Sequence, residues 1–203
     1  MGDYQSGISS NGPLARTVAD AAALLDVMSG YIPGDPYWLP SPETSFLEAT
    51  KQVSNPLKIA FCDHMPPFTK SEPIVKETVD KTAKLLESFG HFLEINCPSV
   101  EALIEPFTKI WQSGIGASGL PPSMLSPLNN WFREQRVSAG EYLQAVQQIQ
   151  IFSRQLVVFF EHFDVLLLPV YLHQPIKIGQ WAHLSPQETL ETVSYTHLRA
   201  HET

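Results

Sequence analysis

A thiol, a carboxylate and an imidazole follow one another at Cys62, Asp63 and His64, and these residue types build nucleophilic and metal sites. Neighbouring residues of a strand point to opposite faces of a sheet, so we expect these three side chains not to converge. The segment is interpreted as a strand end that enters a polar loop. The second cysteine, Cys97, lies far along the chain, and both thiols are expected to be reduced in a cytoplasmic protein.

Residues 114–119 spell Gly-x-Gly-x-x-Gly, which in a dinucleotide-binding protein follows a strand and opens a helix. Here residues 107–112 have helical spacing, and Pro121 and Pro122 would break any helix that followed. The small residues therefore indicate close backbone packing or the wall of a pocket, with Trp111 as a candidate substrate contact beside it. No cofactor site and no metal site is expected.

The elements that would position such residues alternate between strand and helix. Strands are expected at 57–62 and 91–95, and between them a helix capped by Ser71 with Pro73 in its first turn. This order and length are typical of a parallel crossover. A capping box at Ser138 opens a long helix to about residue 162, and the apolar run 164–169 after it has the profile of a buried strand. The pattern predicts an α/β fold.

Composition limits the class of partner. The chain of 203 residues carries a formal net charge of -8, and its 13 Lys and Arg residues are scattered. Nucleic acids and anionic membranes favour clustered positive charge, so neither is expected as a partner. No apolar run reaches the roughly 18 residues that a membrane-spanning helix needs.

Residues 12–20 carry the most specific pattern in the chain. Thr17, followed three positions later by Asp20, predicts a capped helix that continues to about Gly30, with Val18 and Met28 on its apolar face. The spelling Gly-Pro-x-x-Arg-Thr-Val-x-Asp also closely resembles a stretch of the amidase signature family. The run 163–169, followed by Pro175 and Ile178-Gly179, is similar to a second stretch of the same family.

The resemblance implies a fold, an activity and several site residues. The fold would be part of the amidase signature fold, a mixed β-sheet covered by helices, and the substrate a small-molecule amide. The strand that ends at Pro169 would reach the mouth of the substrate cleft, which makes Val170, Tyr171 and His173 candidate substrate contacts. A surface histidine is the alternative for His173. The remaining candidates are structural motif residues: Gly12, Pro13, Arg16 and Asp20, with Arg16 as an anchor.

The family hydrolyses amides with a Lys and two Ser from a Gly- and Ser-rich core, through an acyl-enzyme. No Lys precedes Lys51, and no Gly-Gly-Ser-x-Arg stretch occurs. Residues 1–192 are therefore expected to be the C-terminal part of an amidase, inactive alone and without cofactor, in the cytoplasm, with a homo-oligomer as one option. Two alternatives stay open: the glutaminase-type subunit of a tRNA-dependent amidotransferase, and a catalytically silent binding or interaction module.

Residues 193–203 form a separate tail in this scheme. They resemble translated sequencing-adapter sequence and are expected to be non-native. His197 and His201 stand four positions apart, a spacing that suits a helical metal pair. We reject a metal site there because of that resemblance.

Overall fold

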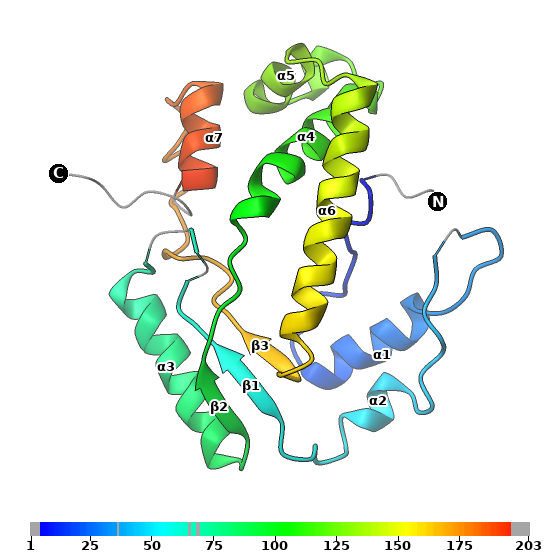
Figure 1. The fold of residues 1–203 in the computed structure, drawn as a ribbon, viewed down its shortest axis with the longest axis vertical. Coiled ribbons are helices and arrows are strands. Elements are labelled where there is room, and N and C mark those ends of the chain that lie inside the picture. The colour runs from blue at the N-terminus through cyan, green and yellow to red at the C-terminus, as the bar shows by residue number, and fades with distance from the viewer. Residues whose placement is uncertain (1–4, 36, 65, 68–69, 196–203) are drawn as a thin grey trace. The chain divides into compact units, whose positions relative to one another are not determined.

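The computed structural model describes residues 5–35, 37–64, 66–67 and 70–195. The chain divides into two compact units, Met1–Asn55 and Pro56–Thr203. Figure 1 labels the elements along the chain. The first unit holds α1 (Val18–Met28) and α2 (Phe46–Ala49). The second unit holds β1 (Lys58–Phe61), α3 (Pro73–Ser88), β2 (Phe92–Ile95), α4 (Glu101–Ala117), η1 (Pro122–Met124), α5 (Pro127–Glu134), α6 (Ala139–Phe159), β3 (Val165–Leu167) and α7 (Pro186–Tyr195).

Helix α1 begins where the sequence predicts. The backbone N–H of Asp20 donates to Thr17 Oγ1 at 3.1 Å, which satisfies one of the free amides of the first turn. Beyond the helix, Gly30 takes a φ of +127°, a conformation that glycine adopts without steric cost. The predicted apolar face is only partly correct within this unit, because Ala22 is buried while Val18 is 76% exposed and Met28 is 52% exposed.

A three-stranded sheet organises the second unit, with the order β2-β1-β3. Both pairings are parallel, and Phe61 lies opposite Ile95 on one side and Leu167 on the other. The neighbours Ile59 and Ala60 point to opposite faces of β1, and both are buried, so the central strand is covered on its two sides. The predicted α/β class is confirmed. The three described strands all pair in parallel.

Helix α3 forms the crossover between β1 and β2, but its cap differs from the prediction. The N-cap residue is Glu72 and not Ser71. Pro73 explains the difference, since proline fits the first position of a helix and leaves the residue before it as the cap. The backbone N–H of Glu72 donates to the carbonyl of Leu172 at 2.7 Å, which holds the start of α3 beside the segment after β3.

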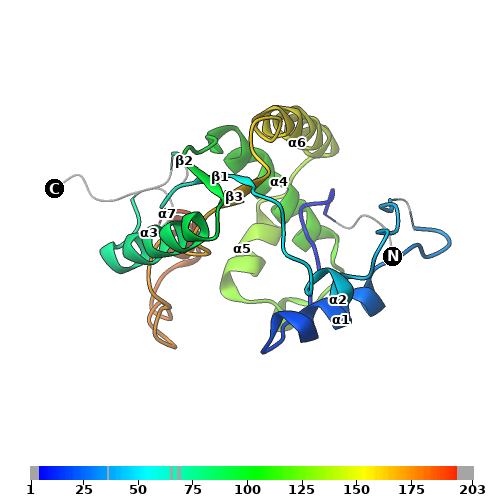
Figure 2. The ribbon, with the colours of Figure 1, turned by 90° about the horizontal axis from the view of Figure 1, so that it is seen from below.

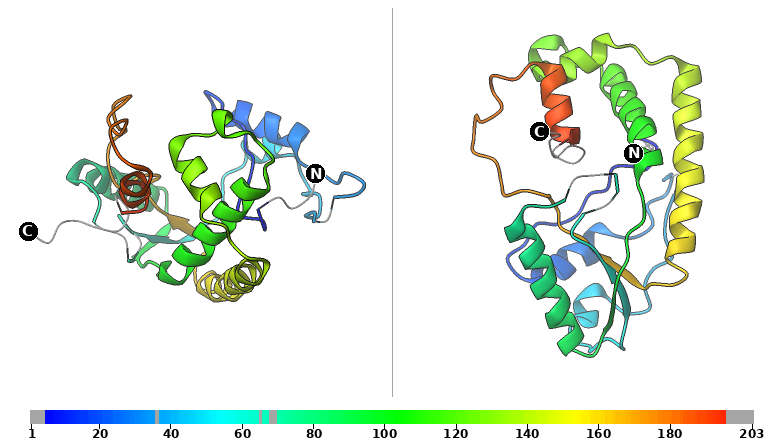
Figure 3. Two further views of the ribbon diagram at one scale, coloured as in Figure 1. Left: turned by 90° about the horizontal axis from the view of Figure 1, so that it is seen from above. Right: turned by 60° about the vertical axis from the view of Figure 1, so that its left-hand side comes forward.

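The remaining helices of the second unit form a bundle next to the sheet. Helices α4 and α6 pack along one another, α5 packs against α4, and α7 contacts α5. In the end-on views of Figures 2 and 3, α3 and α6 lie on opposite sides of the sheet. Gly114 and Gly116 lie inside α4, which is not the strand–turn–helix context of a dinucleotide loop. Among the described residues, no helix is long and apolar enough to cross a membrane.

The capping box predicted at Ser138 is present, and its Glu141 also contacts a residue of α4. Ser138 Oγ accepts from the backbone N–H of Glu141 at 3.2 Å, and the Glu141 carboxylate accepts from the Ser138 N–H at 2.8 Å. The same carboxylate lies 3.0 Å from Lys109 Nζ on α4. The hydrogen bond from the Ser138 backbone, followed by the bond from Lys109, lowers the pKa of Glu141 to about 2.

The low pKa of Glu141 predicts that the folded chain loses stability as the solution becomes acidic. The pKa of Glu141 is lower in the folded chain than in the unfolded chain, so its contribution is present above the unfolded value and is lost as pH falls toward about 2. We expect Glu141→Gln to be less stable than the native chain at pH 7, with the gap closing between about pH 4.5 and about pH 2. Urea denaturation at a series of pH values measures this gap. Glu105→Gln, on an exposed residue of α4, is the control, and an equal pH effect in both variants would contradict the assignment.

Candidate functional site

A pocket of about 340 Å³ lies between α3 and the segment that follows β3. Helix α3 contributes Ile74, Thr78 and Val79 to its wall, and the segment contributes Val170, Tyr171 and His173. Three of the four predicted substrate contacts therefore share one pocket. Residues of α3 form the opposite wall.

Hydrogen bonds from both neighbouring elements hold the segment after β3. The N–H of Cys62 donates to the carbonyl of Leu167 at 3.2 Å, and the N–H of Gln174 donates to a carboxylate oxygen of Glu72 at 3.2 Å. Leu172 is buried and fixes the middle of the segment, with its carbonyl bound to the Glu72 N–H. The pocket wall is thus tied to the start of α3 at two successive points.

His173 is oriented by its own backbone neighbour. Its Nδ1 lies 2.6 Å from the carbonyl oxygen of Gln174. A carbonyl carries no proton to donate, so Nδ1 is the donor in this contact. The His173 ring centre lies 5.8 Å from that of Tyr171 and 6.3 Å from that of Trp181. Sequence reasoning missed Trp181, because only its aromatic type could have indicated a role.

Trp111, the fourth candidate, lies in the aromatic core of the helices. Its ring centre is 4.8 Å from that of Phe132 on α5 and 6.2 Å from that of Phe107. It does not line the pocket that holds His173. Substrate contact by any of the four residues stays a prediction, and for Trp111 the structure gives a packing role.

The structural motif residues belong to the first unit. Asp20 closes the cap of α1 through its backbone N–H. Pro13 is half-buried, and Gly12, Arg16 and Asp20 are exposed within the described chain. The role of Arg16 as an anchor stays a prediction.

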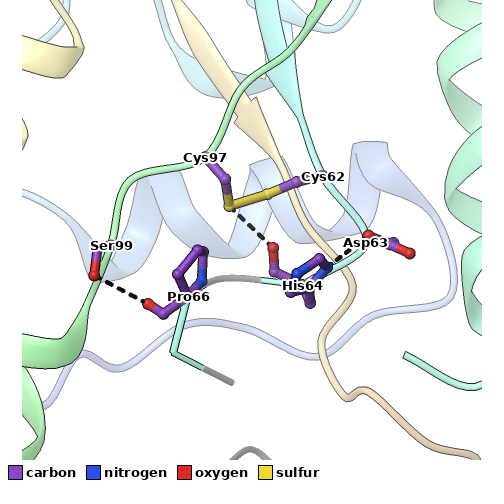
Figure 4. The surroundings of a disulfide bond; sticks show 6 residues. All are labelled: Cys62, Asp63, His64, Pro66, Cys97 and Ser99. Carbon is purple, nitrogen blue, oxygen red and sulfur yellow. Dashed lines mark hydrogen bonds and ion pairs between the residues drawn. A yellow bond between two sulfur atoms is a disulfide. The ribbon is translucent and has the colours of Figure 1, made fainter. Parts of the chain in front are cut away.

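The expectation of reduced cysteines is wrong for this structure, because Cys62 and Cys97 form a disulfide (Figure 4). The parallel register explains the pairing. Phe61 lies opposite Ile95, so the residues that follow the two strands emerge side by side, and the two Cα atoms are 5.9 Å apart. Closing a loop of 35 residues stabilises a fold by about 3–4 kcal/mol in the chain-entropy account. The cysteines therefore give no support to a reducing compartment.

Asp63 and His64 do contact each other, which corrects part of the first expectation. His64 Nδ1 lies 2.8 Å from Asp63 Oδ1 (Figure 4). Burial raises the pKa of Asp63, but the hydrogen bond with His64 and the charges of His64 and Lys76 outweigh it, so the pKa lies below its usual value. A carboxylate can orient an imidazole in this way for catalysis, but the thiol of Cys62 is tied up in the disulfide and is no nucleophile.

The part of the chain that the structure describes contains no cluster of side chains that could hold a metal ion. No group of three or more His, Cys, Asp and Glu side chains is arranged to hold an ion there. The spaced pair His197 and His201 lies outside the described residues.

The fold of this chain is similar to that of a hydrolase of known structure. The structure of 6-aminohexanoate cyclic dimer hydrolase complexed with substrate superposes with a TM-score of 0.76, at 21% sequence identity. The match covers 85% of this chain and 39% of the hydrolase chain. At this identity the likeness shows the fold.

Comparison of sequences identifies the family. The Amidase family model matches residues 1–200. A putative amidase of Synechocystis sp. is 50% identical over 193 residues, which are 95% of this chain and 38% of the relative. An amidase of Pseudomonas putida is 27% identical over 93% of this chain and 42% of its own length. The chain therefore spans about two fifths of the length of these relatives, and it belongs to the amidase family.

Proposed function

We propose that this chain forms part of an amidase that hydrolyses the carbon–nitrogen bond of a small-molecule amide through a serine acyl-enzyme. The observation that carries the proposal is the 50% identity to the Synechocystis putative amidase over 95% of the chain. The family match over residues 1–200 supports the same reaction class. The alternative of a catalytically silent binding module has no comparable support.

The chain would contribute the substrate pocket and not the nucleophile. Residues 1–192 would form the C-terminal part of the enzyme, and the Lys and the two Ser would belong to the rest of it. This division is consistent with the absence of Lys before Lys51. Val170, Tyr171 and His173 would contact substrate at the pocket beside α3. A cytoplasmic location and a homo-oligomer belong to the same proposal.

The isolated chain should have no activated serine. We expect no labelling by a fluorophosphonate serine probe, because serine becomes nucleophilic only beside a suitable base. Mass spectrometry of the 203-residue protein after incubation measures the labelling, with an active serine hydrolase as the positive control. Stoichiometric labelling of one serine would contradict the proposed division of the active site.

A glutaminase-type role is the second candidate. A glutamyl-tRNA(Gln) amidotransferase subunit of Synechococcus sp. is 31% identical over 57% of this chain. That match is shorter and less similar than the match to the putative amidase. Copurification of the full-length protein with a second, unrelated protein chain would favour the amidotransferase role, and a protein active without one would favour the amidase.

A further inference from the structure

The disulfide between Cys62 and Cys97 joins the segments that follow two parallel strands, and one of its sulfur atoms touches the backbone of His64 (Figure 4). We propose that this disulfide is a redox switch. A dithiol reductant opens it in the folded chain, and its opening releases the contacting pair Asp63 and His64. The inference goes beyond the proposed function, since it concerns a covalent modification and requires no amide hydrolysis.

The two cysteines differ in their access to solvent. Cys62 directly follows the central strand β1 and is only 7% exposed. Cys97 follows β2, which is an edge strand of the described sheet, and is half-buried. The rate of thiol–disulfide exchange depends on which sulfur atom an attacking thiolate can reach. The geometry therefore directs a reductant to Cys97 Sγ and makes Cys62 the leaving thiolate.

The exchange balances with one dithiol as the reductant. Its first thiolate bonds to Cys97 Sγ, the bond between the two protein sulfur atoms breaks, and Cys62 leaves as a thiolate that takes up a proton. The second thiolate of the reductant then attacks the first sulfur of the reductant in the mixed disulfide, and Cys97 leaves and takes up a proton. Two electrons thus pass from the dithiol, which becomes a disulfide, to the two cysteines, which become thiols.

Other bonds join the same two strands and do not involve sulfur. The N–H of Asn96 donates to the carbonyl of Phe61 at 3.3 Å, and the N–H of Val100 donates to the carbonyl of Pro66 at 2.8 Å. The parallel pairing of β1 with β2 extends over the whole length of both strands. The sheet can therefore persist when the disulfide opens, so reduction does not require unfolding.

The Asp63–His64 pair, in contrast, depends on the disulfide for its position. His64 Nδ1 lies 2.8 Å from Asp63 Oδ1, and the His64 carbonyl oxygen lies 3.1 Å from Cys97 Sγ (Figure 4). Among the described residues, Cys97 is the only one besides Asp63 with a polar contact to His64. A reduced cysteine side chain can rotate, and its S–H is only a weak donor. Opening the disulfide therefore removes the fixed contact of the pair with the segment after β2.

Reduction of the folded 203-residue chain by dithiothreitol tests the accessibility. After removal of the reductant, alkylation in guanidinium chloride and mass spectrometry count the reduced cysteines, and we expect two. Phe132→Ala, a core substitution in the same unit, separates the two possible routes. It should leave the rate of reduction unchanged, whereas a route through unfolding of the unit would make reduction about a hundredfold faster or more.

Two variants with one cysteine each test the point of attack. Cys62→Ala leaves only Cys97, and Cys97→Ala leaves only Cys62. We expect Cys97 to react with the disulfide reagent DTNB about tenfold faster or more than Cys62, since a buried thiol reacts only after a local opening of the fold. Circular dichroism confirms that each variant is folded. A faster reaction of Cys62 would contradict the assigned point of attack.

NMR of the histidine rings tests the release of the pair. The Hε1 signal of His64, assigned with a His64→Gln variant, should shift on reduction. His91 is the control, because it lies at the other end of β2 and its Nδ1 accepts from the Leu57 N–H at 3.1 Å. Its signal should stay in place. The double variant Cys62→Ala/Cys97→Ala should show the His64 signal of the reduced chain and should not respond to dithiothreitol.

Two results would overturn the inference. The first is a disulfide that dithiothreitol opens only through unfolding, seen as resistance in native buffer or as faster reduction of Phe132→Ala. The second is an unchanged His64 signal in a folded chain whose reduction mass spectrometry has shown. Either would leave the proposed amidase reaction standing, since none of these measurements requires catalysis. Labelling of the isolated chain by the fluorophosphonate probe would instead count against the proposed function alone.

Discussion

Replacing Phe132 with alanine is expected to lower the free energy of unfolding of the second unit by about 3–5 kcal/mol. Phe132 is only 1% exposed and packs edge-on against Trp111, with ring centres 4.8 Å apart. The ring centre of Trp131 also lies 5.5 Å from that of Phe132. Removing the ring takes away its apolar burial and leaves a cavity that rigid neighbours fill only in part. Such a loss is a large fraction of the stability of an ordinary domain.

Urea denaturation followed by circular dichroism measures this effect without depending on tryptophan fluorescence. Phe89→Ala is the matched control, since Phe89 is 68% exposed at the end of α3 in the same unit. Its substitution should change stability by no more than about 0.5 kcal/mol. Equal losses in the two variants would show that the aromatic cluster of α4 and α5 is not the core of the helical bundle.

Local signals in the sequence were sufficient for most of the elements. The cap at Thr17 and the capping box at Ser138 are contacts between residues three positions apart. Such contacts can be predicted from the residue types and their spacing alone. Ser71 shows the limit of such signals, because the sequence predicted it as the cap, whereas Pro73 at the start of α3 leaves Glu72 in that position. The helix–strand order and the α/β class followed from these local patterns.

Contacts between distant residues could not be predicted in the same way. The disulfide of Cys62 and Cys97 depends on the register of two parallel strands, and spacing along the chain does not contain that register. For the same reason, the sequence could not predict that the ring of Trp111 on α4 packs against the ring of Phe132 on α5.

The candidate site was predictable in part. Val170, Tyr171 and His173 are close in sequence, so the resemblance to the family was enough to group them. Their partners were not predictable, since Glu72 reaches Gln174 across 102 positions, and the ring contact between Trp181 and His173 depends on the path of the loop between them.

A chimeric enzyme gives the second large effect and tests the central claim, that this chain is an interchangeable part of an amidase. In the chimera, the 193 matched residues of the Synechocystis putative amidase are replaced by the corresponding residues of this chain. The rest of the relative would supply the nucleophile and its base, while this chain would supply the pocket. Because the two sequences are identical at half of the positions over the exchanged region, we expect the two parts to be compatible in packing.

The decisive measurement is the turnover of an amide that the intact relative hydrolyses, made on the relative, the chimera and the isolated chain. We expect the chimera to turn the amide over at least about a million-fold faster than the isolated chain, which should remain at the uncatalysed rate. A folded chimera without activity, beside an active relative, would contradict the claim. So would turnover by the isolated chain.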